Sequence, residues 1–239
     1  MLRMRRWLLG LVVSVALLIA GCGGSNHRNF EPWQAEGLWS GTTSFGTLDG
    51  VVLDTGEYWF IYGSGGVARS VVHGNGFFSG GRFVSDDGAD YFFGYDRPFV
   101  STLNARVEPE FSIDGELSLE GRPQGFSVGF VPEYRFPANP AEIVGRRRGS
   151  GSTLLSAGDF VIDIDPQGNF IAGLAGSCDY AGRILPNRNG RNVFDIALAS
   201  QATCPFLFSA NGVLVATNGR LVITAVTPDR RDVFYAVAQ

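Results

Sequence analysis

Residues 50–62 read GVVLDTGEYWFIY, and this short stretch decides the fold. It contains two mainly apolar runs, 50–54 and 58–62, and the turn residues Asp54, Thr55 and Gly56 lie where the first run ends. Short runs rich in β-branched and aromatic residues are typical of strands, and a tight turn between two such runs joins antiparallel neighbours. The stretch therefore predicts a β-hairpin whose second strand is apolar on both faces.

The same pattern continues on both sides of this hairpin. No stretch after Gly37 keeps a 3.6-residue apolar period for three turns, so helices are not expected. The expected strands are 38–44, 50–54, 58–62, 68–73, 81–84, 91–95, 100–107, 116–120, 125–131, 143–148, 158–164, 169–172, 179–185, 192–199, 212–217, 220–226 and 232–238. Short turns between them favour an all-β, antiparallel meander.

The chain also matches itself at an offset of roughly 100 residues. Four segments recur in the same order: 37–41 with 145–149, 52–60 with 161–170, 78–83 with 179–184, and 111–117 with 208–214. This order indicates a duplication, although meanders that share turn chemistry can imitate each other. We therefore expect two tandem units, 37–138 and 139–239, each with about eight strands that close into a small barrel. The alternative is one larger barrel or sandwich shared by both units.

Residues 1–21 have the three parts of a secretory signal: a basic start, an apolar core over 7–19 and small residues before a cysteine. The motif Ile19-Ala20-Gly21-Cys22 resembles the lipobox of bacterial lipoproteins. That resemblance implies cleavage before Cys22, a diacylglyceryl group on its sulfur and usually acylation of its new amino group. Gly23 in place of Asp resembles the pattern of release to the outer membrane. The expected location is the outer membrane, with the body facing the periplasm or exposed at the surface.

Two alternatives to a lipid anchor remain. A transmembrane anchor needs about 20 apolar residues, whereas the run here is about 14. Ordinary signal cleavage would instead leave Cys22 as a plain thiol. Residues 22–36 are polar, without periodicity, and read as a flexible tether. At about 3.3 to 3.6 Å per residue, the tether would keep the folded part within roughly 50 Å of the membrane.

Composition excludes several classes of protein. All 19 basic residues are arginine, which rules out Schiff-base chemistry and phosphate loops that need lysine. Removal of the leader leaves 16 basic and 23 acidic residues, a net charge of about −7, so nucleic acid is not an expected partner. Two cysteines remain after Cys22, and we expect Cys178 and Cys204 to form a disulfide in an oxidising compartment. The alternative, a catalytic thiolate, would need a histidine partner.

Four aromatic residues are candidates for a ligand site. Gly37-Leu38-Trp39 resembles the G-x-W of lipocalins, which implies a tryptophan that plugs the base of a ligand-binding barrel. A purely structural tryptophan that closes the barrel is the alternative. In 58–62, one face must meet a core, and the other could meet the second unit, a ligand or a partner. The candidate ligand-binding residues are thus Trp39, Tyr58, Trp59 and Tyr62.

Catalytic, metal and cofactor sites are not expected. No G-x-S-x-G motif is present, and His73 has no partner that the sequence identifies. Residues 163–168 begin like a calcium loop, but Leu174 stands where the bidentate glutamate should be. The chain resembles small proteobacterial β-rich envelope lipoproteins in its lipobox, G-x-W-x-G and glycine-rich strands, a likeness that implies no activity. We expect a non-catalytic binding or interaction module with an envelope protein as partner. The alternative is a carrier or scavenger of a small apolar ligand in a lipocalin-like barrel.

Overall fold

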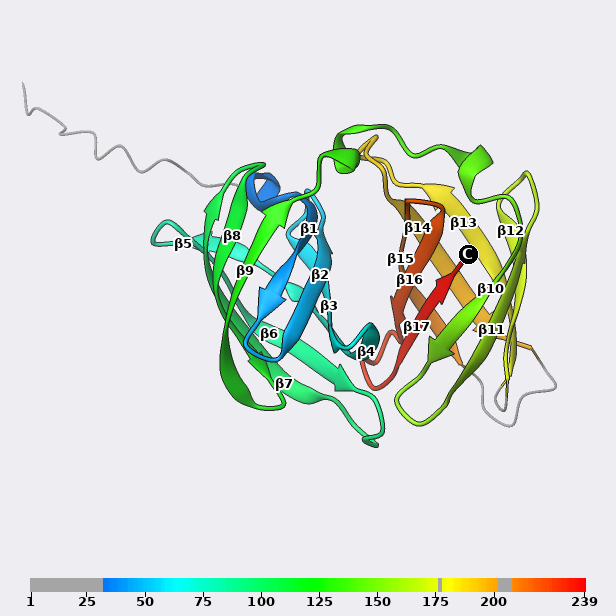
Figure 1. Cartoon of the computed structure of the whole chain (residues 1–239), viewed down its shortest axis with the longest axis horizontal. Helices are drawn as coiled ribbons and strands as arrows, with labels where there is room; N and C mark the ends of the chain where they lie inside the picture. The colour runs from blue at the N-terminus through cyan, green and yellow to red at the C-terminus, as the bar shows by residue number, and fades with distance from the viewer. Residues whose placement is uncertain (1–31, 176–177, 202–207) are drawn as a thin grey trace, which may run out of the picture.

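The first half of the chain forms a closed barrel, as a computed structural model describing residues 32–175, 178–201 and 208–239 shows (Figure 1). Eight antiparallel strands close into the barrel, because β1 pairs with β9 and β4 pairs with the second half of β6. The short β5 pairs only with the first residues of β6. The strands are β1 (Gly37–Thr43), β2 (Gly46–Val52), β3 (Glu57–Ser64), β4 (Val67–Asn75), β5 (Phe77–Ser79), β6 (Arg82–Phe92), β7 (Phe99–Glu108), β8 (Ser112–Leu119) and β9 (Arg122–Phe130).

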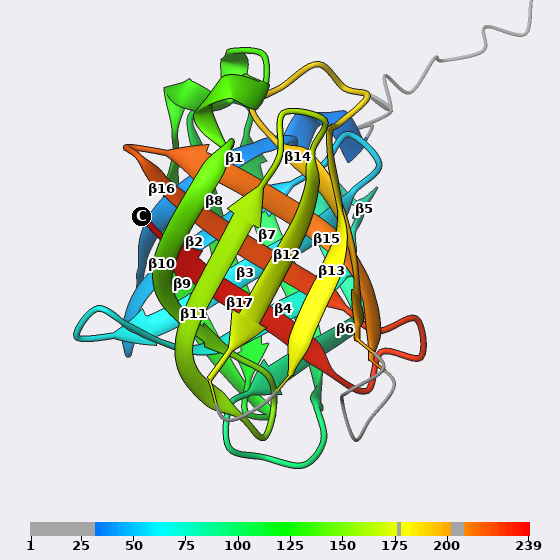
Figure 2. The same cartoon turned by 90° about the vertical axis from the view of Figure 1, so that its right-hand side faces the viewer.

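The second half forms another closed barrel of eight antiparallel strands, with β10 paired to β17 (Figure 2). Its strands are β10 (Gly145–Ser152), β11 (Ala157–Ile164), β12 (Asn169–Leu174), β13 (Asp179–Pro186), β14 (Phe194–Ser200), β15 (Ser209–Thr217), β16 (Arg220–Val226) and β17 (Val233–Ala238). The tight turn between β15 and β16 is Asn218-Gly219, both at positive φ, as a two-residue hairpin requires. The prediction of two tandem all-β barrels is confirmed, and the shared larger barrel is wrong.

One strand differs from the sequence expectation. Residues 81–84 and 91–95 were expected as two strands, but the single strand β6 runs through most of this range and β5 precedes it. The register of β6 on β7 shifts between Ser85 and Gly88, which marks a bulge. Asp86, Asp87 and Gly88 are residue types that are common in turns, but the bulge keeps them within one strand.

The interiors of both barrels are filled with side chains. The first encloses large buried groups, among them Trp39, Leu48, Tyr58, Phe60, Phe83 and Leu103. The second encloses Phe160, Ile162, Tyr180, Phe194, Ile223 and Phe234 in the same way. Strand alternation explains the choice, because Tyr58 and Phe60 of β3 point inward while Trp59 and Ile61 point outward.

Only two of the four sequence matches fall on equivalent strands of the two barrels. Segments 37–41 and 145–149 lie in the first strand of each barrel, and 52–60 and 161–170 both lead from the second strand into the third. In contrast, 78–83 falls on β5 and β6 whereas 179–184 falls on β13, and 111–117 falls on β8 whereas 208–214 reaches β15. These last two matches join strands at different places in the barrel order, so they reflect shared turn chemistry.

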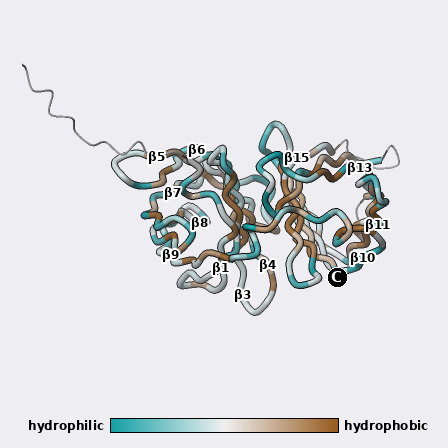
Figure 3. The backbone as a smooth tube through the Cα atoms, turned by 90° about the horizontal axis from the view of Figure 1, so that it is seen from above, coloured by the Kyte–Doolittle hydropathy of each residue, from teal (hydrophilic) through white to brown (hydrophobic). Residues whose placement is uncertain are grey.

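The two barrels pack against each other through their outer faces. A third buried apolar cluster draws Val51, Leu53, Trp59, Val71 and Tyr91 from the first barrel and Leu154, Val193, Val213, Val215, Val226 and Val233 from the second. Figure 3 shows hydrophobic segments of both barrels on the sides that face each other. The second face of the apolar strand β3 thus meets the second unit.

A short linker bridges the barrels at one end of this contact. It contains two 3₁₀ turns, η2 (Pro132–Arg135) and η3 (Pro140–Glu142), and a third turn, η1 (Pro32–Ala35), precedes β1. The Tyr134 hydroxyl donates to Glu36 Oε1 at 3.0 Å, and Asn189 of the second barrel donates to the same oxygen at 3.1 Å. Burial raises the pKa of Glu36. Among the described residues, no helix has the length and apolar character to cross a membrane.

Candidate functional site

Two cavities lie where the outer faces of the barrels meet, and Trp59 and Val213 line both of them. The first, which we call the apolar cavity, has a volume of about 440 Å³. The second, which we call the polar cavity, has a volume of about 580 Å³. Volumes of this size are typical of small-molecule sites, which favour the crevice between domains.

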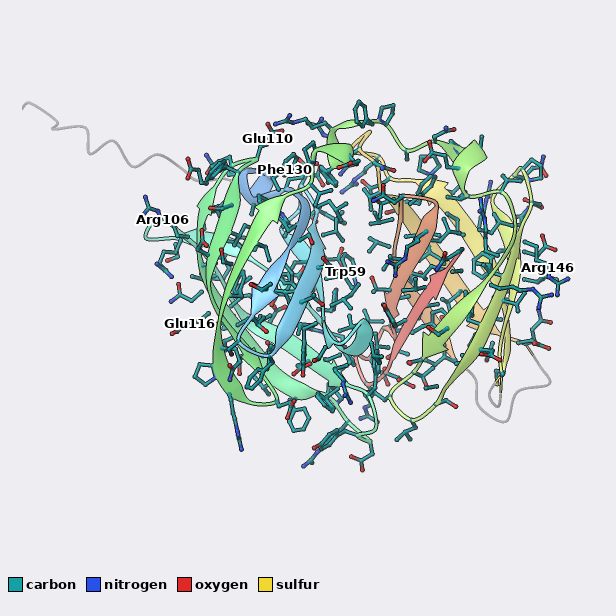
Figure 4. The ribbon with its side chains drawn as sticks, in the orientation of Figure 1. Trp59, Arg106, Glu110, Glu116, Phe130 and Arg146 are labelled. Atoms are coloured by element: carbon teal, nitrogen blue, oxygen red, sulfur yellow. The ribbon has the colours of Figure 1, made fainter. Side chains whose placement is uncertain are left out.

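Trp59 is central because of its position on β3. Its neighbours Tyr58 and Phe60 fill the first barrel, so alternation turns the indole out toward the second barrel, where Figure 4 shows it. Only 3% of the residue is exposed. Yet the indole Nε1 is buried without a hydrogen-bond partner among the described residues. A buried, unpaired donor costs free energy, and tryptophan N–H groups usually find an acceptor when they are buried.

The walls of the apolar cavity are rows of residues that face each other across neighbouring strands. On the first barrel, Leu38, Val51 and Trp59 form one row, and Ser40, Asp49 and Ile61 form the next. On the second barrel the successive rows are Val213, Thr224 and Tyr235, then Val215, Val222 and Val237, then Thr217 and Arg220. The first wall changes from an apolar row to a largely polar one, while the second wall runs from a mixed row through three valines to the polar pair Thr217 and Arg220.

Two charged groups line this cavity, and they differ in their partners. Asp49 Oδ1 accepts a hydrogen bond from the Ser40 hydroxyl at 2.6 Å. Arg220 is exposed and forms no ion pair with any residue that the structure describes. Burial raises the pKa of Tyr235 to about 12, so its hydroxyl stays a neutral donor at physiological pH.

The polar cavity is built around His73 of β4, which lies directly opposite Trp59. The two ring centroids are 4.8 Å apart. His73 Nε2 lies 2.9 Å from Glu57 Oε1, and because a carboxylate only accepts, Nε2 carries the proton. In the neutral ring Nδ1 is then an acceptor, and it is buried without a partner in the described part of the chain.

Arg230, in the loop between β16 and β17, joins the barrels at the polar cavity. Its Nη2 donates to the carbonyl of His73 at 3.1 Å and to that of Asp87 at 2.5 Å. In return, the Tyr91 hydroxyl donates to the Arg230 carbonyl at 3.1 Å. Arg230 Nε is a third buried nitrogen for which the described residues supply no partner. Among the described residues, three that line the polar cavity, Trp59, His73 and Arg230, thus each have a buried nitrogen without a hydrogen-bond partner.

A further cavity of about 300 Å³ lies at one end of the first barrel and is lined by Tyr62. The Tyr62 hydroxyl lies 3.4 Å from Glu120 Oε1, and burial raises the Tyr62 pKa. Beside it, Asp90 is fully buried and accepts from the Ser70 hydroxyl and, at 2.7 Å, from the Glu120 backbone N–H. Burial raises the pKa of Asp90 to about 6.

The four candidate ligand-binding residues do not share one site. Trp39 fills one end of the first barrel, donates to the Ala35 carbonyl at 3.0 Å and also borders the apolar cavity. Tyr58 lies in the barrel core, where its hydroxyl is 3.1 Å from Ser85 Oγ. Trp59 lies between the barrels, and Tyr62 lies at the barrel end. Trp59 and Trp39 alone border the same cavity.

The structure describes one of the three cysteines, Cys178. Cys22 and Cys204 lie outside the described residues. Cys178 comes just before β13, where its carbonyl accepts from the Leu174 N–H at 3.2 Å. The disulfide between Cys178 and Cys204 stays a prediction.

Sequence reasoning missed the partners of His73. Glu57 lies 16 residues before it, and Arg230 lies 157 residues after it. Glu57 could have been found, since it pairs with Asn75, which lies two residues after His73 and on the same face of β4. Nothing in the sequence points from His73 to Arg230. In the described ranges, no group of three or more His, Cys, Asp or Glu side chains is placed to hold a metal ion. At the calcium-like segment, Asp165 accepts from the N–H groups of Gln167 and Asn169 in a hairpin turn.

No family model matches the sequence, and no curated protein matches it. A protein of unknown function from the DUF3598 family of Nostoc punctiforme is 12% identical, with coverage of 87% of this chain and 98% of that one and a TM-score of 0.27. The isotype 1 transferrin binding protein B of serogroup B Neisseria meningitidis is 9% identical, with coverage of 80% of this chain and 57% of that one and a TM-score of 0.30. Values this low identify neither a family nor a function.

Proposed function

We propose that this chain is a lipid-anchored, non-catalytic binding protein of the bacterial outer membrane that holds a small apolar ligand in the crevice between its barrels. The observation that carries the proposal is the apolar cavity of about 440 Å³ between the barrels, bordered by the nearly buried Trp59 and by a row of valines from the second barrel. The barrel interiors support it too, because they are filled by their own aromatic and aliphatic side chains.

The anchor half of the proposal is supported by the lipobox at Cys22. Two or three acyl chains hold a protein on a bilayer far more firmly than one chain does. In Cys22→Ser, the precursor should keep its leader or lose its acyl mass, and the protein should leave the detergent-extracted membrane fraction. Unchanged mass and fractionation would contradict the anchor without touching the crevice.

The binding half is tested by native mass spectrometry of the protein purified in mild detergent from its own host. We expect a non-covalent added mass beyond the lipidated chain. Val222→Trp should abolish it, because Val222 is half-buried, lines only the apolar cavity, and a bulky ring there would fill that space. Ile171→Trp is the matched control, since Ile171 is a 63% exposed residue on β12 of the same barrel.

Two outcomes would contradict the apolar cavity as the binding site. A clean mass for the unmodified chain would mean that no small ligand is carried, and would favour an envelope protein as the partner. An added mass retained in Val222→Trp would place the ligand elsewhere.

A further inference from the structure

The rows of the apolar cavity give it a direction. On the second barrel, Val213 lies beside Trp59 at one end and Thr217, paired with Arg220, lies at the other. Four residue steps along a strand separate these rows, a distance of roughly 13 Å. The middle of the wall is formed by Val215, Val222 and Val237. A straight apolar chain of about ten carbons would span this path.

The polar end carries one unsatisfied charge. Arg220 is the only cationic side chain among the described residues that line the cavity, and it has no ion-pair partner among them. Asp49 on the opposite wall accepts a hydrogen bond from the neutral Ser40 hydroxyl and keeps its own charge, so Arg220 is the group of this cavity that attracts an anion. A ligand that covers Arg220 without offering an anion would remove the guanidinium from water at a cost, whereas a carboxylate fits its planar donors.

We infer that the apolar cavity binds an unesterified fatty acid, with its carboxylate at Arg220 and the end of its chain against Trp59. This inference rests on the proposed function and specifies its ligand. The amide of Asn218, in the turn between Thr217 and Arg220, also borders this cavity and is a further group that can donate to a carboxylate.

The position of the chain can be read with bromine, which quenches a tryptophan that it contacts. The probes are 11-bromoundecanoic acid, 2-bromoundecanoic acid, and the alcohol and methyl ester of the first. We expect strong quenching by the 11-bromo acid and weak quenching by the 2-bromo acid. Trp59→Phe should remove the difference if the chain end contacts Trp59. Trp39→Phe is the control for the other tryptophan that borders this cavity, and it should keep the difference. Equal quenching by the two acids would overturn the predicted orientation.

The head group is tested with Arg220→Gln. This variant should weaken the 11-bromo acid by about tenfold and leave the alcohol and the ester unchanged, since only the acid gains charge-assisted hydrogen bonds. Arg146→Gln is the matched control, because Arg146 lies on the far side of the second barrel (Figure 4). Equal binding of acid, alcohol and ester, or an unchanged affinity in Arg220→Gln, would overturn the fatty-acid assignment.

Val222→Trp tests whether the apolar cavity binds ligands at all, separately from whether the ligand is an acid. Val222→Trp should prevent binding of all four probes if the crevice is the site. If Val222→Trp prevents binding of the probes while Arg220→Gln has no effect, the cavity binds apolar ligands, and only the assignment of a fatty acid is wrong. If Val222→Trp binds every probe as the unmodified chain does, the crevice and the fatty acid both fail.

Discussion

Two tryptophans of the first barrel, Trp39 and Trp59, are both almost fully buried but differ in hydrogen bonding. Trp39 donates to the Ala35 carbonyl, and Trp59 has no acceptor among the described residues. Trp39→Phe should therefore lower the free energy of unfolding by about 2 kcal/mol, because it removes a buried hydrogen bond and packed volume. In Trp59→Phe the lost packing is offset by removal of the unpaired donor, and the change should stay within about 1 kcal/mol. Urea denaturation followed by circular dichroism measures both, and equal losses would contradict the contrast.

Asp90 predicts a pH dependence of stability. Its folded pKa, about 6, lies above the ordinary 3.8, so between these values the folded state binds a proton that the unfolded state has released. The contribution of Asp90 is therefore most favourable below about pH 4, declines as the pH rises to about 6, and is then constant. The total decline should be about 2 to 3 kcal/mol.

The measurement is the unfolding free energy between pH 4 and 7 for the unmodified chain and for Asp90→Asn. The variant should lack this decline, because an amide does not ionise, even if it is less stable at every pH. Asp86→Asn, at an exposed position on the same strand, should keep it. A slope that survives in Asp90→Asn would assign it to another group, such as Glu36 or Asp232, whose pKa values burial also raises.

At this scale the sequence predicts which face a side chain takes but not what it meets. Alternation puts Tyr58 and Trp59 on opposite faces of one strand, as the structure has them. That both faces would be covered was also expected, because the strand is apolar throughout. The partner on the outer face comes from β15, about 150 residues away, and no local pattern specifies such a contact.

Among the elements, the loop between β16 and β17 holds the barrels together through one side chain. Arg230→Ala removes the hydrogen bonds to the His73 and Asp87 carbonyls, so it should weaken the contact by about 1 to 3 kcal/mol. Hydrogen exchange should then become faster in β3 and β4. Arg231→Ala is the control, because that side chain is 86% exposed and pairs only at 3.8 Å with Asp229. A similar change in both variants would mean that Arg230 does not hold the interface.

The strands themselves could be predicted well, because turn residues separate almost every apolar run. The exception is instructive. Within β6, Asp86, Asp87 and Gly88 have turn chemistry, yet pairing with β7 on both sides keeps them in one strand as a bulge. Barrel closure by β1 with β9, and by β10 with β17, joins segments about 90 residues apart and depends on the whole sheet rather than on any one stretch.

For the whole molecule, the apolar cluster between the barrels predicts that neither barrel alone can bury all of its apolar surface. Residues 139–239 expressed alone should fold but expose Val213, Val215, Val226 and Val233 to water. We expect this fragment to bind more of the dye ANS than the two-barrel chain does and, unlike that chain, to self-associate. Changing Val213 and Val226 to threonine in the fragment should reduce dye binding. A fragment that stays monomeric and leaves the dye dark would contradict a tightly packed interface.

Because each barrel is closed by pairing its first strand with its last, the order in which the chain is made sets the order of folding. A polypeptide that emerges from the ribosome amino end first can complete the earlier barrel once Phe130 has emerged. The later barrel must wait for Val233–Ala238, and until then β10 and β16 present open edges. A premature stop that removes only these last residues would leave a finished domain joined to a sheet with two unpaired edges.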